Sequence, residues 1–300
     1  MNLMKHILTV FKSTRPSFLV LSPICIFLGY SSAIFTGAEP QQYLIVMVFV
    51  GAICAHISVN TFNEYLDFRS GLDKITQKTP FSGGSGALPE NPGMASLVLT
   101  VAILTVVITL LLGIYFIHLR GMSLLLLLTV GIFIILAYTR WLNKQPLLCL
   151  IAPGLSFGPL YVVGSHVVLA GNYNLVNFYV SIVPFLLICN LLLLNQYPDI
   201  EADKSIGRKN FPIAYGVKKS NIVYMGMAST AVVTVLFGVS ISLLPLTSLL
   251  CLIPMLVVVP IIFGITKYDD DVQKLIPYLA MNVFVTLTTP LMLSISLLII

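Results

Sequence analysis

The sequence predicts an all-α protein that crosses a membrane about nine times, and three observations carry this prediction. Hydrophobic residues make up 58% of the 300 residues and charged residues only 9%, whereas a soluble domain carries about 25% charged residues. The apolar residues fall into long runs, and a membrane-spanning helix needs about 20 of them. The basic residues lie almost entirely on one side of these runs. We therefore expect a single polytopic membrane domain over residues 1–300.

Nine apolar runs of 18 to 23 residues follow one another along the chain. In order, the predicted spans are 17–35, 43–62, 96–117, 122–139, 147–169, 177–194, 221–243, 246–265 and 276–298. The eighth run contains Pro254 and Pro260, so we expect it to be kinked. The five cysteines lie inside the runs without metal-binding spacing, which favours small buried hydrophobic residues.

Lysine and arginine placement predicts the orientation, because short cytoplasmic loops are enriched in these residues. With the N-terminus in the cytoplasm, fifteen of the sixteen basic residues fall on the cytoplasmic side and only Arg120 lies outside. The acidic residues other than Glu39 lie on the same cytoplasmic side. The positive-inside tendency does not explain this second asymmetry, so we expect a polar active surface at the cytoplasmic ends of the helices of a cell-membrane protein. The net charge of +5 comes from loop residues and does not indicate nucleic-acid binding.

Two acidic segments carry the chemistry, and each follows a predicted helix on the cytoplasmic side. They are NTFNEYLDFRSGLDK at 60–74 and NQYPDIEADKSIGRK at 195–209. Both repeat the pattern Asn, Tyr, Asp at the same spacing, followed by a further Asp, and the residues are Asn63, Tyr65, Asp67, Asp73 and Asn195, Tyr197, Asp199, Asp203. Matched segments of this kind are a common way to build a membrane site between two bundles.

Carboxylates at this spacing predict a divalent cation. Asp199 and Asp203 are four residues apart, so on a helix they share one face and repel one another. Mg²⁺ relieves such repulsion, and its usual ligands are one or two carboxylates together with substrate phosphates. Arg69, Lys204, Arg208 and Lys209 stand beside the carboxylates in sequence, and we expect them to bind phosphate oxygens.

These segments resemble the two motifs of the UbiA-type superfamily of intramembrane prenyltransferases. Asn63, Glu64, Tyr65, Asp67, Gly71 and Asp73 are similar to the family's NDYxDxxxGxD form, with Glu64 in place of Asp. Asp199, Asp203, Gly207, Arg208 and Lys209 are similar to its DxxxD motif and the basic stretch that follows. The resemblance covers residues 15 to 290. It implies nine helices around a central cavity, Mg²⁺ as cofactor and a polyprenyl diphosphate as substrate.

The resemblance also implies a role for each motif residue. The predicted metal ligands are Asn63, Asp67, Asp73, Asn195, Asp199 and Asp203, with Asp67 and Asp199 as the principal catalytic residues. The faces of Tyr65, Tyr138 and Tyr197 are expected to stabilise the allylic cation, and Tyr138 is included among the catalytic residues. From their position in the second span, His56 and Asn60 lie one helical turn apart and are expected to face the cavity. The alternative for His56 is a histidine whose hydrogen bonds are satisfied within the membrane. The segment FSGGSGALPENPG at 81–93 is either a lid over the site or a plain connector.

The segment GLSFGPLYVVGSHVV at 154–168 resembles the dihydroxynaphthoate polyprenyltransferase branch and predicts a flat bicyclic aromatic acceptor for quinone biosynthesis of the menaquinone type. A monocyclic acid such as hydroxybenzoate or homogentisate is the alternative, because the branch's YxxPP element is replaced by Tyr138, Thr139, Arg140 and Trp141. Two other classes compete. A CDP-alcohol phosphatidyltransferase would need a DGxxAR-like signature, which is missing, and a secondary transporter would place charges mid-helix, where none occurs.

Overall fold

The computed structural model describes residues 2–76, 78–268 and 271–299, and every regular element in them is a helix. The first half contains α1 (Asn2–Ser13), α2 (Pro16–Leu19), α3 (Leu21–Phe35), α4 (Gln42–Ser70), η1 (Leu72–Lys74), α5 (Ala87–Glu90), η2 (Pro92–Met94), α6 (Ala95–Arg120), η3 (Met122–Leu124), α7 (Leu125–Ala137) and η4 (Leu142–Lys144). The second half contains α8 (Pro146–Leu155), η5 (Ser156–Val163), α9 (Gly164–Ala170), α10 (Leu175–Asn195), α11 (Ile200–Ser205), α12 (Phe211–Tyr215), α13 (Val217–Ser240), η6 (Leu246–Leu252), η7 (Pro254–Val257), α14 (Val258–Lys267) and α15 (Val272–Leu298).

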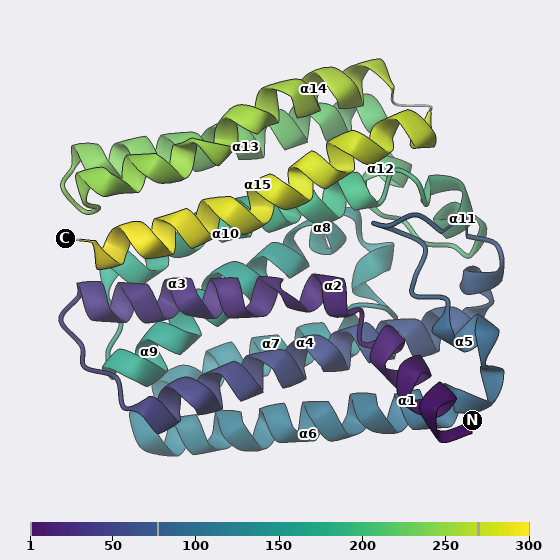
Figure 1. Ribbon diagram of the computed structural model, residues 1–300, viewed down its shortest axis with the longest axis horizontal. Coiled ribbons are helices and arrows are strands. Elements are labelled where there is room, and N and C mark those ends of the chain that lie inside the picture. Colours follow the sequence, from purple (N-terminus) through teal and green to yellow (C-terminus); the bar gives the residue numbers. More distant parts are fainter. Residues whose placement is uncertain (1, 77, 269–270, 300) are drawn as a thin grey trace.

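Eight of the helical stretches in the described residues are long and apolar enough to cross a membrane, and a shorter apolar helix, Met122–Ala137, makes a ninth. These nine stretches coincide with the nine predicted runs, so the predicted fold class is confirmed. The long helices run alongside one another, and the two chain ends lie at opposite ends of the bundle (Figure 1). The packing is built around α10, which contacts α3, α8, η5, α13 and α15.

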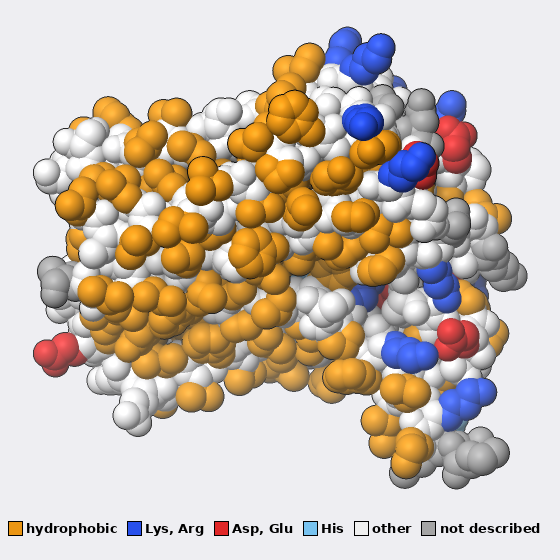
Figure 2. Space-filling model, turned by 45° about the horizontal axis from the view of Figure 1, so that its top comes forward, with side chains coloured by type: hydrophobic (Ala, Val, Ile, Leu, Met, Phe, Trp, Pro, Cys, Tyr) orange, Lys and Arg blue, Asp and Glu red, His pale blue; other side chains and the backbone are white. Residues whose placement is uncertain are grey.

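Charged side chains gather at one end of the bundle, and hydrophobic side chains cover most of its length (Figure 2). We call the charged end, which carries α1, η1, α5, η4, α11 and α12, the polar end. Lipid explains the apolar flanks, because large side chains such as Leu126 and Phe263 are each 70% exposed there. The cysteines are free, with four buried and Cys54 half-buried, as predicted.

Proline accounts for the departures from regular helix. The eighth predicted run begins with the 3₁₀ segments η6 and η7 and becomes α-helical only at Val258. Pro254 has no N–H to donate within this stretch, so the expected irregularity is present. In the fifth run, η5 is a π-helical segment that contains Pro159. A β-carbon on Gly154 or Gly158 would lie 2.4 to 2.6 Å from backbone oxygens of α10, so only glycine permits this close packing.

The first acidic segment is more helical than the sequence indicated. We expected the second span to end near residue 62, with the acidic residues following it, but α4 continues to Ser70 and ends at Gly71, whose φ is +81°. Asn63 and Asp67 therefore project from the last turns of a membrane helix. The second segment follows α10, and Asp203 N–H donates to Asp199 O at 2.8 Å in the first turn of α11. The predicted sharing of one helical face by these two aspartates is confirmed.

Candidate active site

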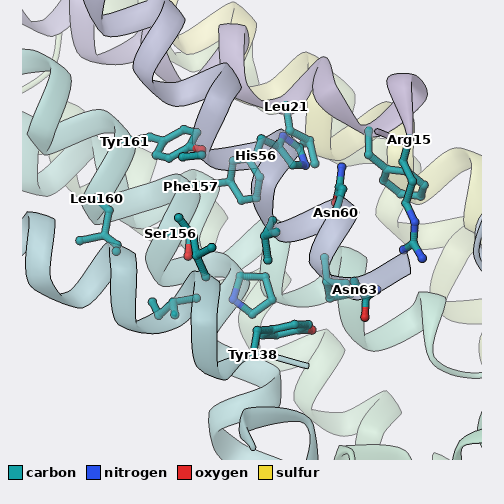
Figure 3. Close-up of a pocket in the computed structure, with 18 of the residues that line it drawn as sticks. Arg15, Leu21, His56, Asn60, Asn63, Tyr138, Ser156, Phe157, Leu160 and Tyr161 are labelled. Carbon is teal, nitrogen blue, oxygen red and sulfur yellow. The ribbon is translucent and has the colours of Figure 1, made fainter. Parts of the chain in front are cut away.

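A deep cavity runs through the bundle to the polar end, and we call the part of it that is lined by the acidic segments the mouth. Its walls come from α3, α4, α6, α7, α8, η5 and α10, and the close-up view shows the lining from Leu160 and Tyr161 to Asn63 and Arg15 (Figure 3). On α4 the lining extends from Val48 to Asp67, or about 28 Å of helix axis at 1.5 Å per residue. That depth is close to the thickness of a bilayer's hydrocarbon core, which is about 30 Å. The cavity is apolar except at its mouth and at a few polar groups in the middle.

The two acidic segments meet at the mouth, although they are far apart in sequence. Asp67, Asp73, Asp199 and Asp203 all line the cavity there. Arg208 joins the two segments, because its guanidinium donates to Asp67 Oδ1 from one nitrogen and to Asp203 Oδ1, at 2.9 Å, from another. Asn210 Nδ2 donates to the other oxygen of Asp203 at 3.0 Å. A single cation thus bridges two carboxylates that would otherwise repel one another.

Several buried oxygen atoms at the mouth have no hydrogen-bond donor among the residues that the structure describes. They are Asp73 Oδ2, Asp199 Oδ1, Asn195 Oδ1 and Gln196 Oε1. Burial, together with the neighbouring carboxylates of Glu64 and Asp67, raises the pKa of Asp73 to about 7. Burial, with the nearby charge of Asp203, raises the pKa of Asp199 to about 6. Carboxylate and amide oxygens of this kind fit a hard divalent cation. The charge of such a cation would favour the ionised form of the two carboxyl groups.

Within the described residues, no group of three His, Cys, Asp or Glu side chains is arranged to hold a metal ion. Of the predicted metal ligands, Asn63, Asp67, Asp73, Asn195, Asp199 and Asp203 all line the cavity. The tertiary structure therefore brings this predicted set together, and their role as ligands stays a prediction.

The other predicted residues divide between the cavity and the surface. Tyr138, His56, Asn60 and Arg208 line the cavity, whereas Arg69, Lys204 and Lys209 are exposed and do not contribute to its described lining. Tyr65 and Tyr197 are also outside that lining. Tyr197 is buried, and its hydroxyl donates to Asn221 Oδ1 at 2.7 Å. Only Arg208 of the four predicted diphosphate-binding residues therefore reaches the carboxylates.

The middle of the cavity combines aromatic rings with fixed polar groups. His56 Nδ1 lies 2.8 Å from Ser22 Oγ, and its ring meets the edge of Phe157 at 4.9 Å between centroids. Tyr161 donates from its hydroxyl to Ala52 O at 2.8 Å, and its ring packs against Phe157. Asn60 Nδ2 donates to Thr14 O at 2.9 Å, as it projects beside His56 (Figure 3). These contacts hold flat side chains rigidly along one wall.

Sequence reasoning missed Glu64 and Arg15, which form a buried ion pair at the mouth. The Glu64 side chain is fully buried, and its Oε1 accepts from Arg15 Nε at 2.7 Å and Nη2 at 2.6 Å. The same carboxylate accepts from Ser85 N–H at 2.8 Å and from Ser85 Oγ at 2.5 Å. Arg15 precedes the first span and gave no motif signal. Glu64 stood inside the first motif, and its departure from Asp was the available signal.

Segment 81–86 crosses the mouth between the two acidic segments. Gly83 N–H donates to Asp199 Oδ2 at 3.2 Å, while Ser85 is held by Glu64 on the opposite side. Gly83, Gly84 and Gly86 all have φ between +70° and +84°, which glycine adopts without strain. A β-carbon on Gly84 would lie 3.0 Å from Asp73 Oδ1. This part of the segment covers the carboxylates, and whether it opens and closes stays a prediction.

Removing the charge of Glu64 is expected to destabilise the fold. Glu64→Gln leaves the guanidinium of Arg15 without its main partner, and breaking a buried ion pair from one side costs about 3 kcal/mol. The measurement is thermal or denaturant unfolding in detergent. Glu90→Gln is the matched control, because Glu90 pairs with Lys12 at an exposed position with a 3.3 Å contact, where a pair contributes less than about 1 kcal/mol. Equal effects of both variants would contradict the structural role of Glu64.

Comparisons with known proteins agree with the fold. A family model described as the UbiA prenyltransferase family matches residues 20–285. A curated relative, 1,4-dihydroxy-2-naphthoate octaprenyltransferase from Bacillus subtilis (strain 168), is 30% identical over 211 residues, which are 68% of this chain. The match spans 65% of that relative's length, or slightly under two thirds.

Solved structures share the architecture at low sequence identity. The apo structure of a UbiA homologue from Aeropyrum pernix K1 superposes with a TM-score of 0.71 at 15% identity, covering 94% of this chain and 98% of that one. A UbiA homologue from Archaeoglobus fulgidus bound to GPP and Mg²⁺ has a TM-score of 0.59 at 14% identity, covering 95% and 99% of the two chains. At these identities the likeness establishes a common fold.

Proposed function

Because this chain belongs to the UbiA prenyltransferase family, we propose that it transfers a polyprenyl group from polyprenyl diphosphate to an aromatic acceptor with the help of Mg²⁺. The observation that carries the proposal is the meeting of two acidic segments at the mouth of a deep apolar cavity. Such a mouth suits a diphosphate bound through metal ions, and the apolar walls suit an isoprenoid tail. The relative bound to GPP and Mg²⁺ supports the same assignment of substrate class.

The residues at the mouth would divide the work of breaking the allylic C–O bond. Asp67, Asp73, Asp199 and Asp203 would hold Mg²⁺, which neutralises charge on the departing diphosphate. Arg208 would donate to the phosphate oxygens, since guanidinium groups form bidentate hydrogen bonds with them. The ring of Tyr138 lines the cavity beside these groups, where its face can stabilise an allylic cation. Segment 81–86 would exclude water, which would otherwise capture that cation.

For the acceptor we propose a flat bicyclic acid of the dihydroxynaphthoate kind. His56, Phe157 and Tyr161 form an aromatic wall of the cavity, with neighbouring rings packed edge to face. Two of these residues belong to the 154–168 segment, and their rings can contact a flat acceptor. Gly154 and Gly158 allow that segment to pack tightly on α10, which turns Phe157 and Tyr161 into the cavity. The name of the Bacillus subtilis relative favours the same acceptor class.

Mass spectrometry of the lipid product tests the function directly. Purified protein in nanodiscs would receive dihydroxynaphthoate, hydroxybenzoate or homogentisate together with prenyl diphosphates of increasing length. A prenylated dihydroxynaphthoate is the expected product, and a prenylated monocyclic acid would reassign the acceptor. The absence of prenylated product from every combination would overturn the proposal. Asp199→Asn serves as the inactive control.

Metal removal is expected to abolish turnover. In excess EDTA the product should fall below detection, and added Mg²⁺ or Mn²⁺ should restore it, because the unpartnered carboxylate oxygens cannot bind a diphosphate without cations between them. The folded state should persist in EDTA, as measured by circular dichroism, since Arg208 already bridges Asp67 and Asp203 without metal. Full turnover in EDTA would contradict the proposed chemistry.

We further propose that the polar end faces the cytoplasm of the cell. A thiol reagent that cannot cross the bilayer should label Ser70→Cys and Ser205→Cys only from that side, because both positions are exposed at the polar end. Ser123→Cys, exposed at the opposite end, is the matched control and should be labelled only from outside. Native thiols contribute little background, since the five cysteines are buried or half-buried. Reversed labelling would overturn the orientation.

A further inference from the structure

Helix α1 leaves a hydrophobic stripe uncovered by the rest of the protein. Met4, Ile7, Leu8 and Phe11 are 78%, 62%, 50% and 58% exposed. Their spacing of three and four residues places them on one face of the helix. The helix lies at the polar end, oblique to the long helices (Figure 1). The stripe is therefore a continuous apolar surface outside the bundle.

The opposite face of α1 is bound to the segment 87–94, which comprises α5, η2 and the residue between them. Thr9 is 2% exposed, and its Oγ1 accepts from Asn91 Nδ2 at 3.1 Å. Val10 packs against the buried cluster that contains Leu88 and Met94. Lys12 Nζ lies 3.3 Å from Glu90 Oε2. One face of α1 thus contacts segment 87–94, and the opposite face, with the apolar stripe, is not covered by the described residues.

The position of α1 in the chain identifies what covers the stripe. The helix ends at Ser13, and the first membrane span starts at Pro16, so only Thr14 and Arg15 separate them. Arg15 has a φ of +52°, which turns the chain between the two helices. A helix joined this closely to a membrane span would lie near the boundary between lipid and water, where headgroups and the first part of the acyl chains would meet its open side.

The charges of α1 suit the surface of an anionic bilayer. Lys5 is exposed beside the apolar stripe, Lys12 is paired with Glu90, and α1 contains no acidic residue that would repel anionic lipid. Basic side chains beside an apolar face are typical of helices that lie in the membrane interface. Anionic lipids in a leaflet attract such basic groups over about a Debye length. Apolar contact and charge therefore favour the same partner.

We propose that α1 is an interfacial helix that binds the bilayer surface through Met4, Ile7, Leu8 and Phe11 and so holds segment 87–94 beside the active-site mouth. Membrane contact would fix the outer face of α1, while Thr9, Val10 and Lys12 of α1 contact segment 87–94. Segment 87–94 continues directly from Ser85, which Glu64 binds at the mouth. The bilayer surface thereby supports the cover over the carboxylates.

Depth-dependent fluorescence quenching tests where α1 lies. The variant Phe11→Trp is placed in a Trp141→Phe background, which removes the one native tryptophan. The protein is reconstituted at one copy per nanodisc, with lipids brominated near the headgroup or near the bilayer centre. We expect shallow bromines to quench the emission at least twofold more than deep ones. Lys5→Trp in the same background is the comparison and should be quenched less than Phe11→Trp by both sets of bromines, because Lys5 lies on the flank of the helix, nearer to water.

Two results would overturn this placement. Equal access of aqueous iodide to Trp at positions 5 and 11, with no quenching by lipid bromines, would show that the stripe faces water. Burial of the Phe11→Trp side chain only in discs that hold two copies would show that a second copy of the chain covers it.

Hydrogen exchange tests the coupling between α1 and segment 87–94. The double variant Ile7→Glu/Leu8→Glu should speed amide exchange in residues 87–94 at least tenfold in anionic nanodiscs, because a charged stripe leaves the interface. Met122→Glu is the matched control, since Met122 is 68% exposed at the opposite end of the bundle, and it should leave exchange at 87–94 unchanged. Unchanged exchange in the double variant, or equal acceleration by Met122→Glu, would overturn the coupling. Both measurements are independent of prenyl transfer.

Discussion

Replacing Asp199 by asparagine is expected to lower the rate of prenyl transfer about a thousandfold, which corresponds to ~4 kcal/mol of transition-state stabilisation. The substitution removes a negative charge from the mouth, where Asp199 Oδ1 is buried without a donor. It keeps an oxygen that can accept from Gly83 N–H, so the covering segment retains its contact. Steady-state turnover with saturating diphosphate measures the loss.

Glu201→Gln is the control for this variant, because Glu201 is an exposed carboxylate on the same short helix, α11. Its rate should stay within about threefold of the parent, since exposed charges interact weakly across water. Asp67→Asn should match Asp199→Asn, and the double variant should lose far less than the product of the two effects, because both carboxylates serve one diphosphate. Near-normal rates in both single variants would remove the proposed site.

Replacing Arg208 by alanine is expected to lower the rate about a hundredfold or more, as for other preorganised donors to a developing negative charge. The same variant should bind Mg²⁺ more tightly in the absence of diphosphate. Arg208 occupies the carboxylates of Asp67 and Asp203 in the metal-free protein, and it must leave them when cations arrive. Calorimetric titration with Mg²⁺ alone measures this second effect, which has the opposite sign to the first.

Lys209→Ala provides the matched control, because Lys209 is the adjacent basic residue and its side chain is exposed. A change below about threefold is expected in both rate and metal affinity. Arg208→Lys should recover only part of the rate, since an ammonium group cannot bridge two carboxylates as a planar guanidinium does. Weaker Mg²⁺ binding in Arg208→Ala would show that the guanidinium does not compete with metal.

The sequence by itself determined the class of fold, the nine spans and the two acidic segments. Span detection succeeds because lipid demands a long apolar run wherever the chain crosses, and this demand is local in sequence. The sequence showed that Asp67 and Asp199 occupy corresponding positions, because the two acidic segments repeat the same spacing. The sequence did not show which side chains of each helix line the cavity, because that depends on how each helix is rotated against its neighbours.

Only the tertiary structure selected the charges that enter the site. Lys204, Arg208 and Lys209 are close in sequence, yet only Arg208 reaches the carboxylates, because the turn after α11 directs it inward. Arg15 and Ser85 meet Glu64 from distant parts of the chain, a contact that no local pattern records. Burial makes these contacts strong, since charges within a low-dielectric mouth must find partners. Packing therefore decided which charged residues pair with one another. The sequence alone predicted that charged residues gather at the polar end.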